Sequence, residues 1–374
     1  MLLRVTAVVT LAVLGVGVAL PAWAAPSVTA TIGVGVQPYG VAFSPDGTKA
    51  YVTNRIDNTV SVISVANNTV TPPPIGVGAQ PFNVAFSPGG TKAYVTNRGD
   101  GTVSVIDVAT NTVTLPPILI GVGTQPFDVA FSPGGTKAYV TNRGAGTVSV
   151  IDVATNTVTL PPIVGFTQPF EVAFSPDGTK AYVTNPGANT VSVITVATNT
   201  VAATIPIPGL AQPLGVAFSP DGTKAYVTNT GTSTVSVIRV SDDTVTGTIG
   251  VGANPVGVAF SPDGTQAYVT NNTAGTVSVI NVVDNTVVGL PIPAPTQPYA
   301  VAFSPDGTKA YVTNVNAIMV SVISTGLAPF PPVAPAALPP TGADASGTLV
   351  FATALTLAGV AVAAGARLRI IRQR

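Results

Sequence analysis

The chain has 374 residues, of which 46% are hydrophobic and 8% are charged, and it contains neither Cys nor His. This composition excludes disulfides and thiolate metal sites, and it removes the usual general base of enzymes near neutral pH. The 15 basic residues equal the 15 acidic residues in number, but residues 25–341 hold ten basic against fourteen acidic residues, a balance that disfavours binding to nucleic acid.

The first 24 residues have the organisation of a secretory signal peptide. Arg4 forms a short basic region, Val5 to Leu20 is apolar and uncharged, and Ala22 and Ala24 have the spacing that signal peptidase reads. We therefore expect cleavage after Ala24. A retained N-terminal anchor is the alternative, although the apolar stretch is shorter than the roughly 20 residues that cross a bilayer as a helix.

Residues 27–324 consist of a unit that recurs seven times. Each unit contains Val-Ala-Phe-Ser-Pro, then Tyr-Val-Thr-Asn, then a segment close to Thr-Val-Ser-Val-Ile. Internal repetition at a fixed period is the strongest indication of architecture that a sequence carries. The copies of Tyr-Val-Thr-Asn begin at Tyr51, Tyr94, Tyr139, Tyr182, Tyr226, Tyr268 and Tyr311.

Each unit predicts four short strands. The three segments above form the first three, and a more variable Thr-Val-x-x-x-Ile segment forms the fourth. Ser-Pro-Asp-Gly-Thr supplies the turn between the first two, with Gly89 and Gly134 in place of Asp in units two and three. Four strands in a period of about 40–45 residues are typical of a propeller blade. We therefore predict an all-β fold, a seven-bladed β-propeller of four-stranded antiparallel blades.

The seventh unit ends near Ser324 without a fourth strand, and residues 28–33 form an additional strand before the first unit. We predict that this N-terminal strand completes the last blade, with Val28 to Ile32 hydrogen-bonded to Val320 to Ser324. Such pairing would close the ring and cover the exposed strand edge.

Departures from the repeat indicate where a binding site lies. The residue before Val-Ala-Phe is polar in units two to four, and the residue after Tyr-Val-Thr-Asn is arginine in units one to three. We expect these residues to share one sector of one face, either as a site for a polar ligand or a cation or as solvated loops with surface ion pairs. The candidates are Asn83, Asp128, Glu171, Arg55, Arg98 and Arg143.

The C-terminal 50 residues lack the repeat and divide into four parts. Residues 325–337 form a Pro-rich linker, Leu338-Pro339-Pro340-Thr341-Gly342 matches the pattern LPxTG, residues 348–366 are uncharged, and residues 367–374 form a basic tail. The uncharged run is long enough for a transmembrane helix in the precursor, and its basic flank would stay in the cytoplasm. A permanent membrane anchor that carries this pentapeptide by chance is the alternative.

Two resemblances follow from these motifs. The repeats resemble the YVTN family of β-propeller repeats, which implies the fold but no particular activity. The C-terminal segment is similar to the sorting signals of sortase substrates in Gram-positive bacteria. That resemblance implies that a sortase cysteine attacks the carbonyl of Thr341, releases Gly342 and all that follows, and transfers Thr341 to an amine of the peptidoglycan.

The leading hypothesis is a non-catalytic binding protein that is secreted and covalently anchored in the cell wall. Its partners would be sortase, peptidoglycan and an unidentified protein or glycan ligand. We expect no cofactor, no metal and no nucleic acid, and contact with the membrane only through the C-terminal span before sorting. The alternatives are a structural, surface-layer-like envelope component, and a propeller hydrolase such as a lactonase.

Overall fold

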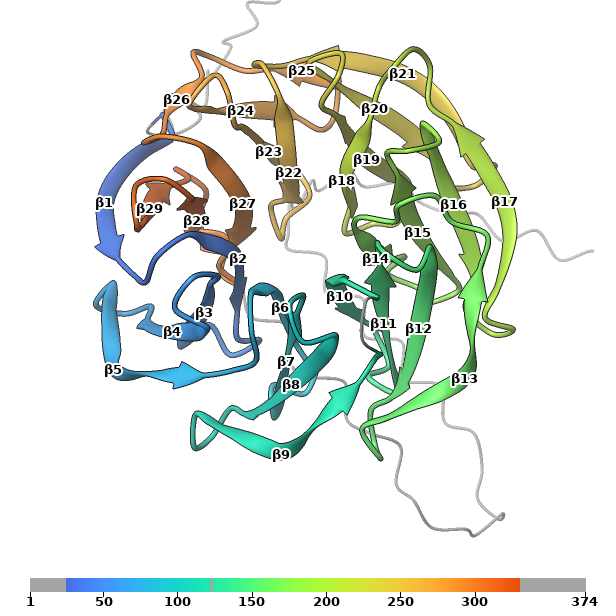
Figure 1. Cartoon of the computed structure of the whole chain (residues 1–374). Coiled ribbons are helices and arrows are strands. Elements are labelled where there is room, and N and C mark those ends of the chain that lie inside the picture. Colours follow the sequence, from blue (N-terminus) through green and yellow to red (C-terminus); the bar gives the residue numbers. More distant parts are fainter. Residues whose placement is uncertain (1–24, 122–123, 330–374) are drawn as a thin grey trace, which may run out of the picture. The chain divides into compact units, whose positions relative to one another are not determined.

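A computed structural model describes residues 25–121 and 124–329, and these form seven antiparallel sheets arranged around a central channel (Figure 1). Each sheet is one blade, so the predicted seven-bladed, all-β propeller is confirmed. The predicted signal peptide, the sorting signal and the hydrophobic segment 348–366 lie outside the described residues. Within the described residues no helix is long and apolar enough to cross a membrane.

The strands follow the repeat unit in order from the channel to the perimeter. The innermost strands are β2 (Pro38–Phe43), β6 (Pro81–Phe86), β10 (Pro126–Phe131), β14 (Val172–Phe174), β18 (Pro213–Phe218), β22 (Pro255–Phe260) and β27 (Pro298–Phe303). The second strands are β3 (Lys49–Asn54), β7 (Lys92–Asn97), β11 (Lys137–Asn142), β15 (Lys180–Asn185), β19 (Lys224–Asn229), β23 (Gln266–Asn271) and β28 (Lys309–Asn314). The third strands are β4 (Thr59–Ser64), β8 (Thr102–Asp107), β12 (Thr147–Asp152), β16 (Thr190–Thr195), β20 (Thr234–Arg239), β24 (Thr276–Asn281) and β29 (Met319–Ser324). The outer strands are β5 (Thr69–Gly76), β9 (Thr112–Leu119), β13 (Thr157–Val164), β17 (Thr200–Pro206), β21 (Thr244–Gly250), the divided pair β25 (Thr286–Val287) and β26 (Ile292–Pro293), and β1 (Ser27–Gly33).

The ring closes as predicted, because β1 is the outer strand of the last blade (Figure 1). It pairs antiparallel with β29, with Val28 opposite Ile323 and Ile32 opposite Val320. Residues almost 300 positions apart in the sequence thus share one sheet, and the edge of β29 is covered.

The sixth blade departs from the four-strand pattern because its outer strand is divided. Gly289 has a φ of 67°, and Pro291, which has no backbone N–H to donate, follows two residues later. Leu290 between them is 90% exposed. The N–H of Val288 still donates to the carbonyl oxygen of Val279 on β24 at 2.8 Å. The chain then leaves β24 and pairs with it again at Ile292.

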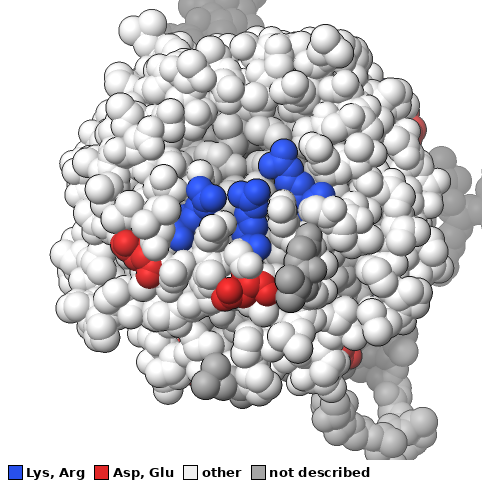
Figure 2. All heavy atoms as spheres, viewed as in Figure 1, with Lys and Arg blue, Asp and Glu red and all other residues white. Residues whose placement is uncertain are grey.

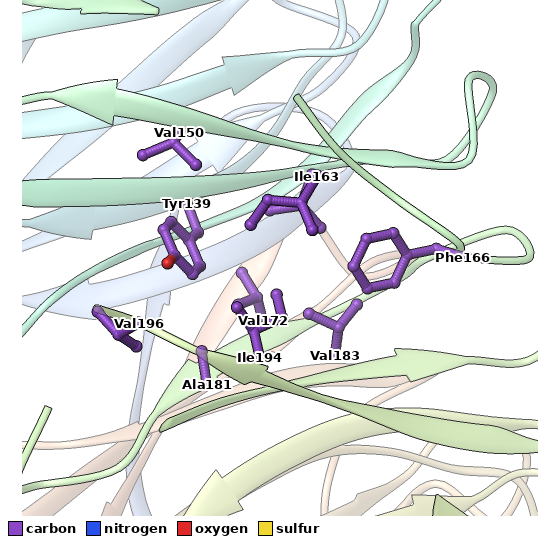
Figure 3. Close-up of a cluster of buried hydrophobic side chains, with 10 residues drawn as sticks. Tyr139, Val150, Ile163, Phe166, Val172, Ala181, Val183, Ile194 and Val196 are labelled. Atoms are coloured by element: carbon purple, nitrogen blue, oxygen red, sulfur yellow. The ribbon is translucent and has the colours of Figure 1, made fainter. Parts of the chain in front are cut away.

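The hydrophobic core is divided into seven equivalent clusters, one between each pair of neighbouring blades. In the cluster drawn in Figure 3, Tyr139 of the third blade packs with Ala181, Val183 and Ile194 of the fourth. The middle strands are buried on both faces, which explains why their sequences are continuous apolar runs and do not alternate between apolar and polar residues. The cluster that joins Tyr311 to Val52 and Ile63 completes the ring between the last blade and the first.

A polar contact repeats beside six of these seven clusters. Between the first two blades the side-chain oxygen Oδ1 of Asn111 accepts hydrogen bonds from Lys49 Nζ at 3.1 Å and Tyr51 Oη at 2.6 Å. The acceptor always lies in the turn between the third and outer strands of the next blade. Between the sixth and seventh blades that turn is missing, because the third and outer strands of the seventh blade, β29 and β1, are not consecutive in the sequence. Gln266 Oε1 and Tyr268 Oη are accordingly buried without a partner among the described residues.

Candidate functional site

An aromatic layer fills the channel near the face that carries the loops between second and third strands. It is built from the residue that follows the Pro leading into the innermost strand, in six of the seven blades. Phe82 packs against Phe127 with ring centroids 3.8 Å apart, and Phe127 packs against Phe170 at 4.5 Å. The members of this aromatic layer are Tyr39, Phe82, Phe127, Phe170, Leu214 and Tyr299.

The loops of the first three blades place three arginines over this layer. Arg55, Arg98 and Arg143 follow β3, β7 and β11, and their backbone N–H groups donate to the carbonyl oxygens of glutamines in the loops that lead into the channel, at 3.0–3.1 Å. Their guanidinium groups lie 5.4–5.7 Å from the centroids of the rings of Tyr39 and Phe127. Such stacking attracts the cation to the ring face and orients it. We call these three residues the arginine cluster.

No carboxylate of the described part of the chain forms a salt bridge with the arginine cluster. Within the described ranges the two salt bridges join Lys180 to Asp243 and Arg239 to Asp242, away from the cluster. Burial lowers the pKa of Arg98, and the charges of Arg55 and Arg143 lower it further. Figure 2 shows basic side chains gathered near the middle of this face, with acidic groups further out. An anion placed there would relieve the mutual repulsion.

Hydrogen bonds leave donors of the cluster free. Arg55 donates from one terminal nitrogen to Gln37 Oε1 at 3.3 Å, and Arg98 donates to Gln125 Oε1 at 3.5 Å. The Nε of Arg55 is buried and has no partner in the part of the chain that the structure describes. Each guanidinium carries five N–H donors, and the hydrogen bonds to the glutamines engage one donor of Arg55 and one of Arg98.

The polar residues of units two to four lie deeper in the channel than expected, and none of the described carboxylates contacts the arginine cluster. Asn83, Asp128 and Glu171 line a cavity of 140 Å³ together with the aromatic rings. They also border the opening at the opposite end of the channel, beside Phe174 and Phe218. The two sets of candidates therefore form two groups, and not one mixed sector.

Asp128 ties three innermost strands together. It is 5% exposed, and its Oδ1 accepts hydrogen bonds from the N–H of Val129 at 2.8 Å and from Asn83 Nδ2. Its Oδ2 accepts from the N–H of Val172 on β14 at 2.8 Å. Burial raises the pKa of Asp128 to about 6, although these hydrogen bonds oppose the rise. The contacts assign Asp128 a structural role in the channel wall.

Glu171 lies beside Asp128, and the two carboxyl groups influence each other. Burial raises the pKa of Glu171 well above its usual value, and the charge of Asp128 raises it further. The equivalent positions of the fifth and sixth blades, Gly215 and Gly257, have no space for a side chain. A Cβ at Gly215 would lie 2.3 Å from the carbonyl oxygen of Val256, and a Cβ at Gly257 would lie 2.6 Å from that of Tyr299. Within the described residues, no group of three or more potential metal-ligating side chains is present.

The aromatic layer was missed by the sequence analysis, although the sequence contains a signal for it. The residue after Gln-Pro at the start of five units is aromatic, at Tyr39, Phe82, Phe127, Phe170 and Tyr299. The seven asparagines of Tyr-Val-Thr-Asn, by contrast, are buried. They donate mainly to Ser and Thr hydroxyls of the third strand, as Asn54 does to Ser61 at 2.9 Å, and so belong to the scaffold.

Comparison with protein families adds a name to this fold. The family described as "Lactonase, 7-bladed beta-propeller" matches residues 24–169, 126–251 and 167–288, which together span residues 24–288. The chain belongs to this lactonase propeller family. The matches overlap because neighbouring repeats of this lactonase-family propeller are nearly identical. The same part of the family sequence pattern can therefore be aligned with more than one repeat.

Solved structures agree on the architecture. Hydrazine synthase from Kuenenia stuttgartiensis contains a chain that is 23% identical to this lactonase-family propeller, with a TM-score of 0.70. The alignment covers 77% of this chain and 96% of the other. At this identity the likeness concerns the fold alone. No curated protein matches the sequence.

Proposed function

We propose that this protein is a non-catalytic binding protein of the bacterial cell surface, and that its propeller takes an anionic ligand at the arginine cluster. The observation that carries the proposal is a group of three arginines held on aromatic rings, with no carboxylate partner among the residues that the structure describes. Their alignment on the rings precedes ligand binding, which lowers the entropic cost of ordering them. The export and sorting signals in the sequence support a position outside the cell.

Absence of catalysis is part of the proposal and rests on the side chains at hand. The sequence contains no His, and the channel carboxyl of Asp128 is engaged by three N–H donors. The arginine cluster lies over the aromatic layer, whereas Glu171 lines the channel cavity and its opposite opening.

Calorimetric titration with citrate, a small trianion, tests the binding site. We expect Arg98→Gln to weaken citrate binding by about tenfold or more, the loss of roughly one charge-assisted contact. Arg239→Gln is the matched control, because Arg239 is paired with Asp242 away from the cluster; it should leave the affinity unchanged. Equal affinities in wild type and Arg98→Gln would refute the site, as would undetectable citrate binding by the wild type.

Attachment to the wall has its own test. Thr341→Ala removes the residue that sortase would join to peptidoglycan. We expect the variant to leave the wall fraction and to remain in the membrane fraction through residues 348–366. Unchanged amounts in the wall would contradict sorting by this motif.

A lactonase is the second candidate, favoured by the family match and by the carboxyl groups of Asp128 and Glu171 in the channel. Proton release from δ-gluconolactone, measured in a pH-stat, separates the two candidates. The binding proposal expects no hydrolysis beyond that of the protein-free solution. Turnover that disappears in Glu171→Gln would favour the enzyme.

A further inference from the structure

A groove leaves the arginine cluster and runs over the fourth and fifth blades. It begins at Arg143 and has a volume of about 450 Å³; its lining includes Pro186, Leu210 and Leu214 as well as the amide side chains of Gln168 and Gln212. Pro186 occupies the position after Tyr-Val-Thr-Asn that holds arginine in the first three blades. The positive charge therefore stops at Arg143, where an apolar surface with a few amides begins. We call this the side groove.

Leu210 is the most informative residue of the side groove. It is 80% exposed, whereas Ile207, three residues earlier on the same connection, is buried in the core cluster as Phe166 is in the preceding one. The loop that carries Leu210 is fixed at its end, because the N–H of Gln212 donates to Asn189 Oδ1 at 2.9 Å. A large apolar side chain on a fixed loop, in the same groove as Arg143, provides a place for an apolar group of a charged ligand.

We propose that the ligand of this face is an acidic peptide segment with an apolar side chain next to its carboxylates. The carboxylates would lie on Arg98 and Arg143, and the apolar side chain would lie in the side groove against Leu210. The proposal rests on the proposed function and specifies its ligand. A peptide fits better than a glycan, because no aromatic side chain lines the side groove to stack on a sugar ring, and the rings nearby lie beneath the arginines. The amides of Gln168 and Gln212 suit the hydrogen-bonding groups of an extended peptide backbone.

Two short peptides separate charge recognition from apolar recognition. The probes are acetyl-Gly-Leu-Glu-Glu-Gly-amide and acetyl-Gly-Ser-Glu-Glu-Gly-amide, each with a neutral fluorophore, and binding is followed by fluorescence anisotropy. We expect the leucine peptide to bind about 5–10 times more tightly than the serine peptide, the gain of burying part of one leucine. Leu210→Ser should abolish this preference and leave the affinity for the serine peptide unchanged.

Leu290→Ser is the matched control, because Leu290 is 90% exposed in the divided outer strand of the sixth blade; it should preserve the preference. If the wild type binds both peptides equally and Arg98→Gln weakens both, the side groove does not bind the apolar side chain, but the anion site stands. If neither peptide nor citrate binds, the proposed function itself fails. If a trigalacturonate oligosaccharide binds more tightly than either peptide, the ligand of this face is an anionic glycan and the peptide proposal is wrong.

Discussion

At the scale of single residues, the same repeat position has different chemistry in different blades, and its neighbours explain why. Asp128 is tolerated in the channel because three N–H donors surround it. Glu171 has less support, since it lies beside Asp128 and its pKa is raised by burial and by that neighbouring charge. A buried acid with a raised pKa costs stability whenever it is ionised.

The raised pKa of Glu171 makes the stability of the protein depend on pH. Because its pKa is raised in the folded protein, the folded state holds the proton more tightly, and stability falls as pH rises from the unfolded pKa through the folded one. We expect Glu171→Gln to raise the melting temperature at pH 8 by about 1–2 °C, the shift that roughly 1 kcal/mol gives in a folded domain of about 300 residues. At pH 4, where Glu171 is protonated, thermal unfolding of the two proteins should coincide.

Asp177→Asn is the control, because the pKa of Asp177 is shifted in the opposite direction to that of Glu171. Hydrogen bonds from Ser175 and Thr179 lower the pKa of Asp177 in its turn. Its contribution is therefore present above its unfolded pKa and is lost as pH falls through the folded pKa. A stabilisation of Glu171→Gln at pH 4 equal to that at pH 8 would show that packing, and not charge, is responsible.

At the scale of elements, the contact between neighbouring blades repeats with one exception. In six interfaces a Tyr hydroxyl donates to an Asn or Asp in the turn between the third and outer strands, as Tyr226 does to Asn285 Oδ1 at 2.6 Å. The seventh interface has no such turn, and there Gln266 replaces the lysine of the other repeats. A lysine at this position would lack the Asn or Asp side-chain oxygen that accepts from it at the other six interfaces, so the substitution avoids a poorly partnered charge.

Two chemically identical substitutions test this explanation. Tyr226→Phe removes a hydrogen bond and leaves Asn285 with fewer donors, so we expect it to lower the free energy of unfolding by about 1 kcal/mol. Tyr268→Phe removes a buried hydroxyl without a partner and should be neutral or slightly stabilising. Urea unfolding of both variants gives the difference. Equal destabilisation would mean that Tyr268 Oη has a partner in solution.

At the scale of the whole molecule, the fold could be predicted from the sequence because the same strand and turn pattern occurs seven times. The interval between repeats, the Ser-Pro-Asp-Gly turns and the missing fourth strand of the last unit predicted the blades and the pairing of β1 with β29. The site was less predictable. Neighbouring residues such as Phe127 and Asp128 both line the channel cavity, since the pairing shifts between Pro126 and Val129. A regular alternation of side chains does not anticipate that arrangement.

The separation of charge along the channel is also a property of the whole ring. The aromatic layer depends on side chains from six blades that meet only when the ring is closed. It keeps the arginine cluster near one end of the channel and the carboxyl groups of Asp128 and Glu171 towards the other. No single repeat contains this information, which explains why sequence analysis expected the two groups side by side.

The most direct test of the central claim, that the arginine cluster is an open anion site, is anomalous diffraction from crystals soaked in selenate. We expect a selenium peak within hydrogen-bonding distance of the guanidinium groups of Arg98 and Arg143, and no such peak in Arg98→Gln crystals soaked in the same way. A wild-type map with selenium only at other positions, or with a carboxylate from the protein lying on the arginines, would contradict the claim.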